Sequence, residues 1–167
     1  MRYLFDDELK NALEHIAKAT EIAQNATCLR SKCGSVVVKL DETIGSGFNS
    51  PPQNLEKQRR CSHSKESLHR KVTEKTCCVH AEQRAIMNAL KENPDKLQGS
   101  RLYFIRLDSK GKPSKAGEPY CTVCSKMALD VGIKEFVLYQ GRGVSVYKTT
   151  EYNELSFKFG TKDHSLN

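Results

Sequence analysis

Segments with helical and strand periodicity alternate along the first 140 residues, and this order constrains the fold more than any other feature of the sequence. Helical patterns cover residues 6–26, 80–91 and 121–131, and strand patterns cover 35–39, 43–48, 101–107 and 135–139. The order is therefore helix, two strands, helix, strand, helix, strand. Such alternation is typical of helices packed on a mixed sheet. We predict one layered α/β domain.

The predicted domain spans residues 1–140 and carries one insertion and one extension. Residues 50–76 are polar, basic and poor in apolar side chains, which indicates a loop or insertion rather than core. The extension, residues 141–167, packs on the same domain or trails from it. Within this extension, 144–147 is a candidate strand, and 151–159 fits either a helix or a strand.

The length and the cysteine content exclude several classes of protein. A chain of 167 residues can bury roughly two-thirds of its unfolded surface, so it needs no disulfides to hold a core. It contains no run of about 18 apolar residues, which excludes a membrane span. The acidic start at Asp6-Asp7 is unlike a signal peptide. Seven cysteines, an odd number, favour a reducing compartment, so we expect a cytoplasmic protein that uses thiols for metal binding or chemistry.

The positive charge of the chain is concentrated in one segment. The net charge is +7, and residues 51–79 contain seven Lys or Arg against three Glu, which accounts for +4 of that total. A concentrated positive field attracts anions such as phosphate, a nucleotide or a nucleic acid. A solubilising surface loop explains the same charge equally well.

Two short motifs contain the residues most suited to chemistry. Cys121 and Cys124 are three positions apart, so one helical turn places both sulfurs on the same face, and His80 begins another predicted helix. One imidazole and two thiolates are suitable ligands for Zn²⁺ and leave a fourth position for water. Glu82, two residues beyond His80, is better placed to move protons than to bind the metal. An H-x-E motif combined with a P-C-x-x-C motif is typical of zinc deaminases that act on nucleobases.

Three further segments resemble the CMP/dCMP-type deaminase family. They are Thr27–Lys39, which resembles the entry to the first strand of that family, the turn Gly47–Pro52, and the helix start His80–Ile86. The similarity covers about residues 8–140. It implies a cytidine deaminase-like fold, in which a mixed central sheet has helices on both faces as three α/β/α layers, and it implies a homo-oligomer. The sequence departs from the family at Tyr120, which separates Pro119 from Cys121, and at Arg84, which replaces the usual Asn.

The resemblance also assigns roles to individual residues. It implies that His80, Cys121 and Cys124 hold the catalytic zinc, that Asn49 contacts the sugar, and that Ala81 presents its backbone near the base. Arg30, Lys32, Arg59 and Arg60 are candidates for binding a 5′-phosphate, because guanidinium groups fit phosphate oxygens. Tyr120 and Phe48 are candidates for stacking on a pyrimidine ring.

A second, structural zinc is a further implication of the resemblance. Cys28 and Cys61 match the places where family members contribute ligands, and the candidates for the remaining ligands are His63, His69, Cys77 or Cys78. We predict the set Cys28, Cys61, His69 and Cys77. A metal would explain how a core-poor insertion keeps its shape. Alternatively, the cysteines are small buried hydrophobic residues and the histidines face solvent.

We therefore predict a zinc-dependent deaminase that acts on a small nucleotide and converts dCMP to dUMP with release of ammonia. One alternative keeps the chemistry but takes tRNA, single-stranded DNA, or a free nucleoside or base as substrate. A second alternative is a zinc-stabilised scaffold without catalysis. The presence of Glu82 argues against a scaffold, because a structural metal site has no use for that carboxylate.

Overall fold

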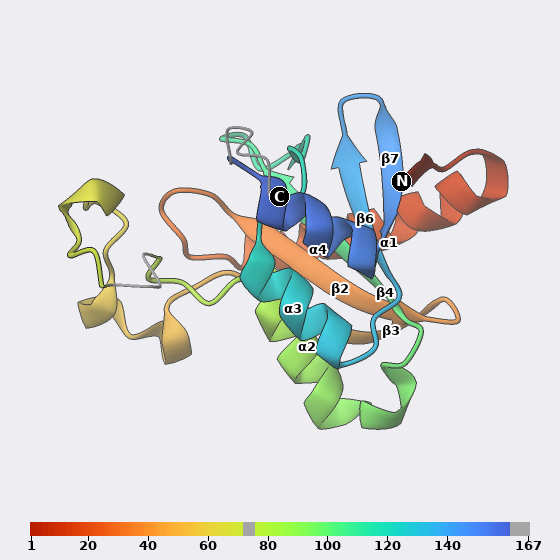
Figure 1. The fold of residues 1–167 in the computed structure, drawn as a ribbon, viewed down its shortest axis with the longest axis horizontal. Coiled ribbons are helices and arrows are strands. Elements are labelled where there is room, and N and C mark those ends of the chain that lie inside the picture. The colour runs from red at the N-terminus through yellow and green to blue at the C-terminus, as the bar shows by residue number, and fades with distance from the viewer. Residues whose placement is uncertain (72–75, 161–167) are drawn as a thin grey trace, which may run out of the picture.

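A mixed β-sheet forms the centre of the molecule (Figure 1). The computed structural model describes residues 1–71 and 76–160. Within them the strand order is β1-β7-β6-β4-β2-β3, and β5 pairs with β4. The strands are β1 (Arg2–Tyr3), β2 (Cys33–Lys39), β3 (Glu42–Phe48), β4 (Arg101–Leu107), β5 (Pro113–Ser114), β6 (Glu135–Gln140) and β7 (Gly143–Lys148). The β4–β6 pair is parallel and the other pairs are antiparallel, which confirms the predicted mixed sheet.

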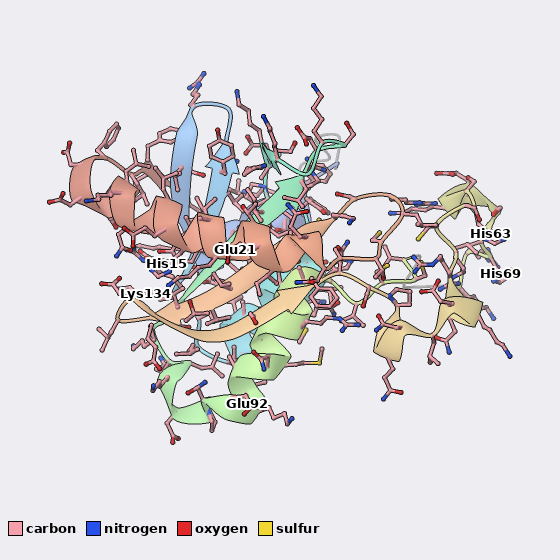
Figure 2. The ribbon with its side chains drawn as sticks, turned by 180° about the vertical axis from the view of Figure 1, so that it is seen from behind. His15, Glu21, His63, His69, Glu92 and Lys134 are labelled. Carbon is pink, nitrogen blue, oxygen red and sulfur yellow. The ribbon has the colours of Figure 1, made fainter. Side chains whose placement is uncertain are left out.

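Helices cover both faces of this sheet. They are α1 (Asp6–Gln24), α2 (Ala81–Glu92), α3 (Thr122–Asp130) and α4 (Thr149–Lys158). Figure 1 shows α2, α3 and α4 in front of the sheet, and Figure 2 shows the reverse side, which α1 covers. Because side chains alternate along a strand, neighbouring residues enter opposite cores. Val36 packs on the α1 side and Val37 on the α2 side. The predicted three-layer α/β/α architecture is confirmed.

Close contact between β3 and α2 fixes where the second helix begins. The backbone of Gly47 lies so near this helix that an added Cβ would sit 2.5 Å from the carbonyl oxygen of Ala81. Only a residue without a side chain allows this approach. The first turn of α2, which follows His80, is therefore pressed against the sheet.

The residues beyond position 140 complete the sheet and one helical layer. Residues 144–147 lie in β7, which pairs with β6 and β1. Helix α4 includes most of segment 151–159, so the helical interpretation is the correct one. The pattern of the sequence did not predict the short strands β1 and β5. Residues 161–167 lie outside the described part of the chain.

The basic insertion extends away from the sheet as a loop with short turns of 3-10 helix (Figure 1). None of the residues from 52 to 71 is buried, as the polar composition predicts. Arg59 ties the insertion to the rest of the molecule by donating to the carbonyl oxygen of Thr27 at 2.8 Å. In the described ranges, no helix combines the length and apolar character that a membrane crossing requires.

Candidate active site

The predicted metal ligands lie at the starts of two helices. His80 is the residue that precedes α2, and its backbone N–H donates to the Gln83 side-chain oxygen at 2.9 Å. Such a contact satisfies an amide that the helix itself leaves without a partner. Cys121 precedes α3 in the same way, and Cys124 follows within its first turn. Two helix starts therefore bring one imidazole and two thiols together.

These three side chains form a compact set of donor atoms. The distances are 3.3 Å from His80 Nδ1 to Cys124 Sγ, 3.4 Å from His80 Nδ1 to Cys121 Sγ, and 3.1 Å between the two sulfurs. Zinc binds nitrogen at about 2.0 Å and sulfur at about 2.3 Å, so neighbouring donors of a tetrahedral ion lie about 3.3–3.8 Å apart. The two distances from His80 fall within that range, and the distance between the sulfurs is slightly shorter. These three residues thus fit a zinc ion whose fourth coordination position stays open.

The two cysteines of this set differ in pKa. Contact with the Cys124 thiol, aided by the His80 imidazole, lowers the pKa of Cys121 to about 4. The same thiol contact, together with burial, raises the pKa of Cys124 well above its usual value. The pair therefore contains a thiolate at neutral pH, and the thiolate is the form that binds metal.

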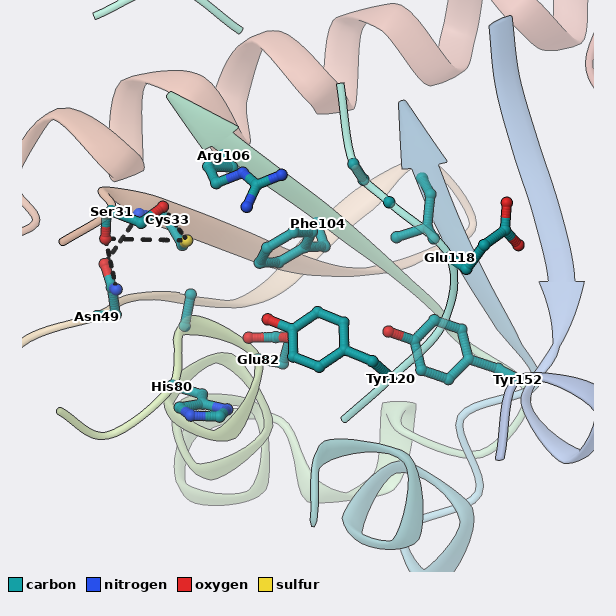
Figure 3. A pocket seen from close by; sticks show the side chains of 14 residues that line it. Ser31, Cys33, Asn49, His80, Glu82, Phe104, Arg106, Glu118, Tyr120 and Tyr152 are labelled. Atoms are coloured by element: carbon teal, nitrogen blue, oxygen red, sulfur yellow. Dashed lines mark hydrogen bonds between the residues drawn. The ribbon is translucent and has the colours of Figure 1, made fainter. Parts of the chain in front are cut away.

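Glu82 is buried beside this donor set. Its side chain is only 7% exposed and lies on the wall of the same pocket as His80 (Figure 3). Burial raises the pKa of the Glu82 carboxyl above its ordinary value, because the charged form loses hydration. A raised pKa makes the carboxyl a better proton acceptor, which suits the proton-transfer role that the sequence predicts for this residue.

Three of the four predicted substrate-binding residues line the pocket, namely Asn49, Ala81 and Tyr120. Asn49 accepts a hydrogen bond from the Cys33 N–H and donates one to the Ser31 carbonyl oxygen, both at 2.8 Å. These two bonds hold its amide in a fixed orientation. Ala81 is fully buried, so only its backbone can take part in recognition.

Arg30 is the exception, because it lies outside this pocket. Its guanidinium donates to the carbonyl oxygens of Cys61, at 2.8 Å, and of His63. The side chain thus holds the insertion instead of facing the substrate. Phe48 is also elsewhere, on another surface groove, where the Arg84 guanidinium lies 5.8 Å from its ring centroid.

Several pocket residues were not predicted from the sequence. Phe104 and Arg106 come from the end of β4, and Tyr152 comes from α4 in the C-terminal extension. An arginine inside the apolar strand pattern of 101–107 was an available signal, because a charge on the packed side of a strand needs a reason. For Tyr152 the sequence offers no such signal, since its position depends on how α4 packs.

A second cysteine cluster lies where the insertion meets the domain. The sulfurs of Cys28, Cys61 and Cys78 are within 4.8 Å of one another, and the Cys77 sulfur is 3.3 Å from that of Cys61. Burial acts to raise the pKa of Cys61, but hydrogen bonds from the Leu29 backbone and from neighbouring side chains lower it to about 7.

His69, which the sequence placed in this second set, is not part of the cluster. Its side chain is exposed, and its Nδ1 accepts a hydrogen bond from the Lys71 backbone N–H at 3.2 Å. Figure 2 shows His63 and His69 on the outer part of the insertion. Cys78 stands in the cluster in place of His69, because the chain entering α2 brings it next to Cys28.

Known proteins are similar to this chain in both sequence and fold. The family model for the cytidine and deoxycytidylate deaminase zinc-binding region matches residues 9–140. The chain is 33% identical over 125 residues to the deoxycytidylate deaminase of Mycobacterium phage D29, a match that covers 71% of this chain and 86% of the phage protein.

Two solved structures show the same fold. Apo dCMP deaminase from the cyanophage S-TIM5 has a TM-score of 0.51 at 23% identity, covering 76% of this chain and 80% of that chain. Cytidine deaminase from Burkholderia pseudomallei has a TM-score of 0.54 at 16% identity, covering 84% and 94% respectively. The cytidine deaminase-like fold implied by the sequence is confirmed. The chain thus belongs to the cytidine and deoxycytidylate deaminase family and is a hydrolytic deaminase.

Proposed function

We propose that this chain is a zinc-dependent deaminase that converts dCMP to dUMP and releases ammonia. The observation that supports this proposal most strongly is the convergence of His80, Cys121 and Cys124 on one point of a pocket whose wall contains the buried Glu82. A structural metal site needs the three ligands but not the carboxylate. The arrangement therefore fits hydrolysis better than scaffolding.

His80, Cys121 and Cys124 would hold the zinc ion. When bound, the ion supplies Lewis acidity that makes water nucleophilic near neutral pH. The thiolate character of Cys121 and the orientation of the His80 backbone by Gln83 prepare the ligands for this role.

Glu82 would carry the protons of the reaction. In the overall reaction, water adds its oxygen to C4 of the cytosine ring, and the bond from C4 to the exocyclic nitrogen breaks. Glu82 accepts a proton from water and passes it to ring N3. It then takes the proton of the added hydroxyl and delivers it to the departing amine, which leaves as ammonia while C4 becomes the carbonyl carbon of dUMP. Because the carboxyl group is regenerated in its original state, one residue serves both transfers.

Asn49, Ala81 and the apolar pocket wall would orient the nucleotide. The amide of Asn49 is held by Cys33 and Ser31 at the pocket wall, so its remaining N–H can meet the sugar without a loss of side-chain freedom. Phe104 provides an aromatic surface next to Glu82 for the pyrimidine ring (Figure 3). The relative from phage D29 is a deoxycytidylate deaminase, which favours dCMP among the cytosine nucleotides.

A substrate panel tests this assignment. Ammonia release from dCMP, CMP, deoxycytidine, cytosine and a short cytosine-containing single-stranded DNA is measured with the metal-loaded protein. We expect the highest kcat/KM for dCMP. If deoxycytidine or cytosine reacts faster than dCMP, the proposed deamination is retained but dCMP is not the preferred substrate.

The single-stranded DNA in this panel tests whether the basic insertion binds a nucleic acid substrate. Binding that neutralises several phosphates weakens steeply as salt rises. If the oligonucleotide is deaminated faster than dCMP, with such a salt dependence, the alternative substrate class is the correct one. Turnover of none of the five compounds would contradict the proposed cytosine deamination altogether.

We also propose a second, structural zinc at the insertion. Cys28, Cys61 and Cys78 would be ligands, and Cys77 supplies the nearest fourth sulfur. Four sulfur donors would close the coordination sphere, as is usual for structural zinc. This site would hold an insertion whose residues from 52 to 71 bury no side chain fully. A homo-oligomer and a cytoplasmic location stay predictions from the sequence.

Removing the Tyr152 ring is expected to damage both stability and catalysis. The ring is 4% exposed, stacks on Phe136 with centroids 4.1 Å apart, and also lines the pocket. Tyr152→Ala should therefore lower the free energy of unfolding by about 3–5 kcal/mol and lower kcat/KM for dCMP. Tyr152→Phe keeps the stacked ring and should keep most of the stability.

Thermal denaturation of the two variants, with steady-state kinetics, measures these effects. Glu154→Ala, an exposed position on the same helix, is the control for a change in α4 that leaves the pocket intact. If Tyr152→Ala retained wild-type stability and activity, α4 would not form part of the active site.

A further inference from the structure

Arg106 is the only lysine or arginine among the described residues that line the active-site pocket. It is the last residue but one of β4 and is half-buried. Figure 3 shows its guanidinium above Phe104, on the side of the pocket where Ser31 and Asn49 lie. A cation therefore stands beside the place proposed for the sugar.

The positive charge of Arg106 is not neutralised in the described part of the chain. Arg101, at the other end of the same strand, forms ion pairs with Glu135 at 2.5 Å and with Glu8 at 2.9 Å. Arg106 has no such ion pair within residues 1–71 and 76–160, and its Nη2 donates only to the Lys115 carbonyl oxygen at 3.3 Å. A guanidinium has five N–H donors, so most of them stay available to an anion.

The spacing along β4 matches a nucleotide in length. Phe104 and Arg106 lie two residues apart, so their side chains emerge on the same face of the strand, about 6.6 Å from each other along it. This separation is comparable to the reach from a pyrimidine ring across its sugar to the 5′-phosphate. A base next to Phe104 and Glu82 thus places its phosphate next to Arg106.

The other cationic side chains that the sequence suggested for phosphate binding lie outside the active-site pocket. Arg30 holds two carbonyl groups of the insertion, Lys32 Nζ lies 3.4 Å from the Gln24 carbonyl oxygen, and Arg59 pairs with Glu56 at 2.6 Å. Arg60 lines the neighbouring pocket beside Cys28 and Cys61. None of these four side chains lines the active-site pocket.

Glu118 gives the pocket a charge of opposite sign on the other side. It is exposed on the pocket rim, and Figure 3 shows it near Tyr152, across the pocket from Asn49. The Glu118 carboxylate repels a phosphate, whereas the Arg106 guanidinium attracts it. A dianionic phosphate is therefore disfavoured beside Glu118 and favoured beside Arg106.

We propose that Arg106 binds the 5′-phosphate of the substrate and makes the enzyme select a nucleoside monophosphate over the free nucleoside. The planar guanidinium can give two parallel hydrogen bonds to phosphate oxygens. This inference rests on the proposed deamination of a cytosine nucleotide and adds the residue that determines phosphate recognition.

Binding of the product and of its nucleoside tests the inference without requiring turnover. Dissociation constants for dUMP and deoxyuridine are measured by titration calorimetry on the metal-loaded wild type, Arg106→Ala, Arg106→Gln and Arg106→Lys. We expect wild type to bind dUMP more tightly than deoxyuridine. Arg106→Ala and Arg106→Gln should reduce this preference about 10- to 100-fold, the range expected for lost hydrogen bonds to a charged group.

Arg106→Lys keeps the charge but not the paired donors, so its preference should lie between that of wild type and that of Arg106→Ala. Arg142→Ala removes an equal charge from the exposed turn between β6 and β7, where the side chain does not line the active-site pocket, and it should keep the wild-type preference. Thermal denaturation establishes that each variant is folded. If Arg106→Ala alone fails to fold, Arg106→Gln and Arg106→Lys still report the preference.

Two results would overturn the role of Arg106. One is equal affinity of wild type for dUMP and deoxyuridine, and the other is a preference that survives in folded Arg106→Ala or Arg106→Gln. The proposed function has a separate readout, namely deamination of dCMP by wild type. Active wild type with an unchanged preference in the variants refutes only Arg106, whereas inactive wild type with an Arg106-dependent preference refutes only the reaction.

Discussion

Glu82→Gln is expected to lower kcat for dCMP by about 10³- to 10⁴-fold while the metal content stays at the wild-type level. The loss corresponds to about 4–5.5 kcal/mol of transition-state stabilisation. The amide has nearly the size and shape of the carboxyl, so packing around the buried side chain changes little. It cannot accept a proton from water or deliver one to the amine, which removes general acid–base catalysis.

Steady-state kinetics and metal analysis of the same preparation check this result. Glu92→Gln is the matched control, because it makes the same chemical change at the opposite, exposed end of α2 (Figure 2). The control should keep the wild-type kcat and metal content. Full activity in Glu82→Gln would show that another group moves the protons, and a loss of metal would show that Glu82 acts as a ligand.

The convergence of His80, Cys121 and Cys124 could be predicted because its pattern is local. One helical turn relates Cys121 to Cys124, and a helix start presents His80. Each fragment needs only the three- and four-residue spacing of a helix to orient its side chains. Only the meeting of the two fragments depends on tertiary structure, and the order of strands and helices already restricts it.

The pocket wall was harder to predict because it depends on tertiary packing. Tyr152 reaches the site only after β7 has paired with β6 and α4 has folded back over the sheet. Arg106 shares a face with Phe104, but whether that face meets the pocket depends on which helices cover it. Arg30 lies outside the active-site pocket for a similar reason, because carbonyl groups distant in sequence accept hydrogen bonds from its guanidinium.

Adjacent cysteines account for the difference between the predicted second ligand set and the observed cysteine cluster. Cys77 and Cys78 are neighbours, and the sequence alone does not determine which of them faces Cys28. The structure places Cys78 there, where Val79 donates to the Ser50 carbonyl oxygen at 3.0 Å and fixes the path of the chain. His69 was predicted as a ligand because it is a histidine in the insertion, but its side chain is exposed and lies outside the cluster.

Cys78→Ala is expected to reduce the metal content from two equivalents per chain to one and to release the insertion. A structural zinc site contributes much of the folding free energy of the segment that it holds. Here the insertion has little else to hold it, since its described residues from 52 to 71 include no buried side chain. The proposed catalytic ligands His80, Cys121 and Cys124 form a separate set, which should keep its own equivalent.

Metal analysis and limited proteolysis with trypsin measure the two effects. Lys57 and Lys65 are exposed cleavage sites in the insertion, and they should be cut faster in Cys78→Ala than in wild type because cleavage requires local opening. Cys77→Ala tests the fourth sulfur in the same assays. Treatment of wild type with a chelator that removes only the second equivalent should give the same cleavage pattern as Cys78→Ala.

His69→Ala distinguishes the structural ligand set from the one that the sequence favoured. Because its ring lies outside the cysteine cluster, the variant should keep two equivalents and the wild-type rate of cleavage. Loss of one equivalent in His69→Ala, with two retained in Cys78→Ala, would restore the original ligand set. A wild-type protein with a single equivalent would mean that the four cysteines hold no metal, and the shape of the insertion would then depend on bonds such as that from Arg59 to Thr27.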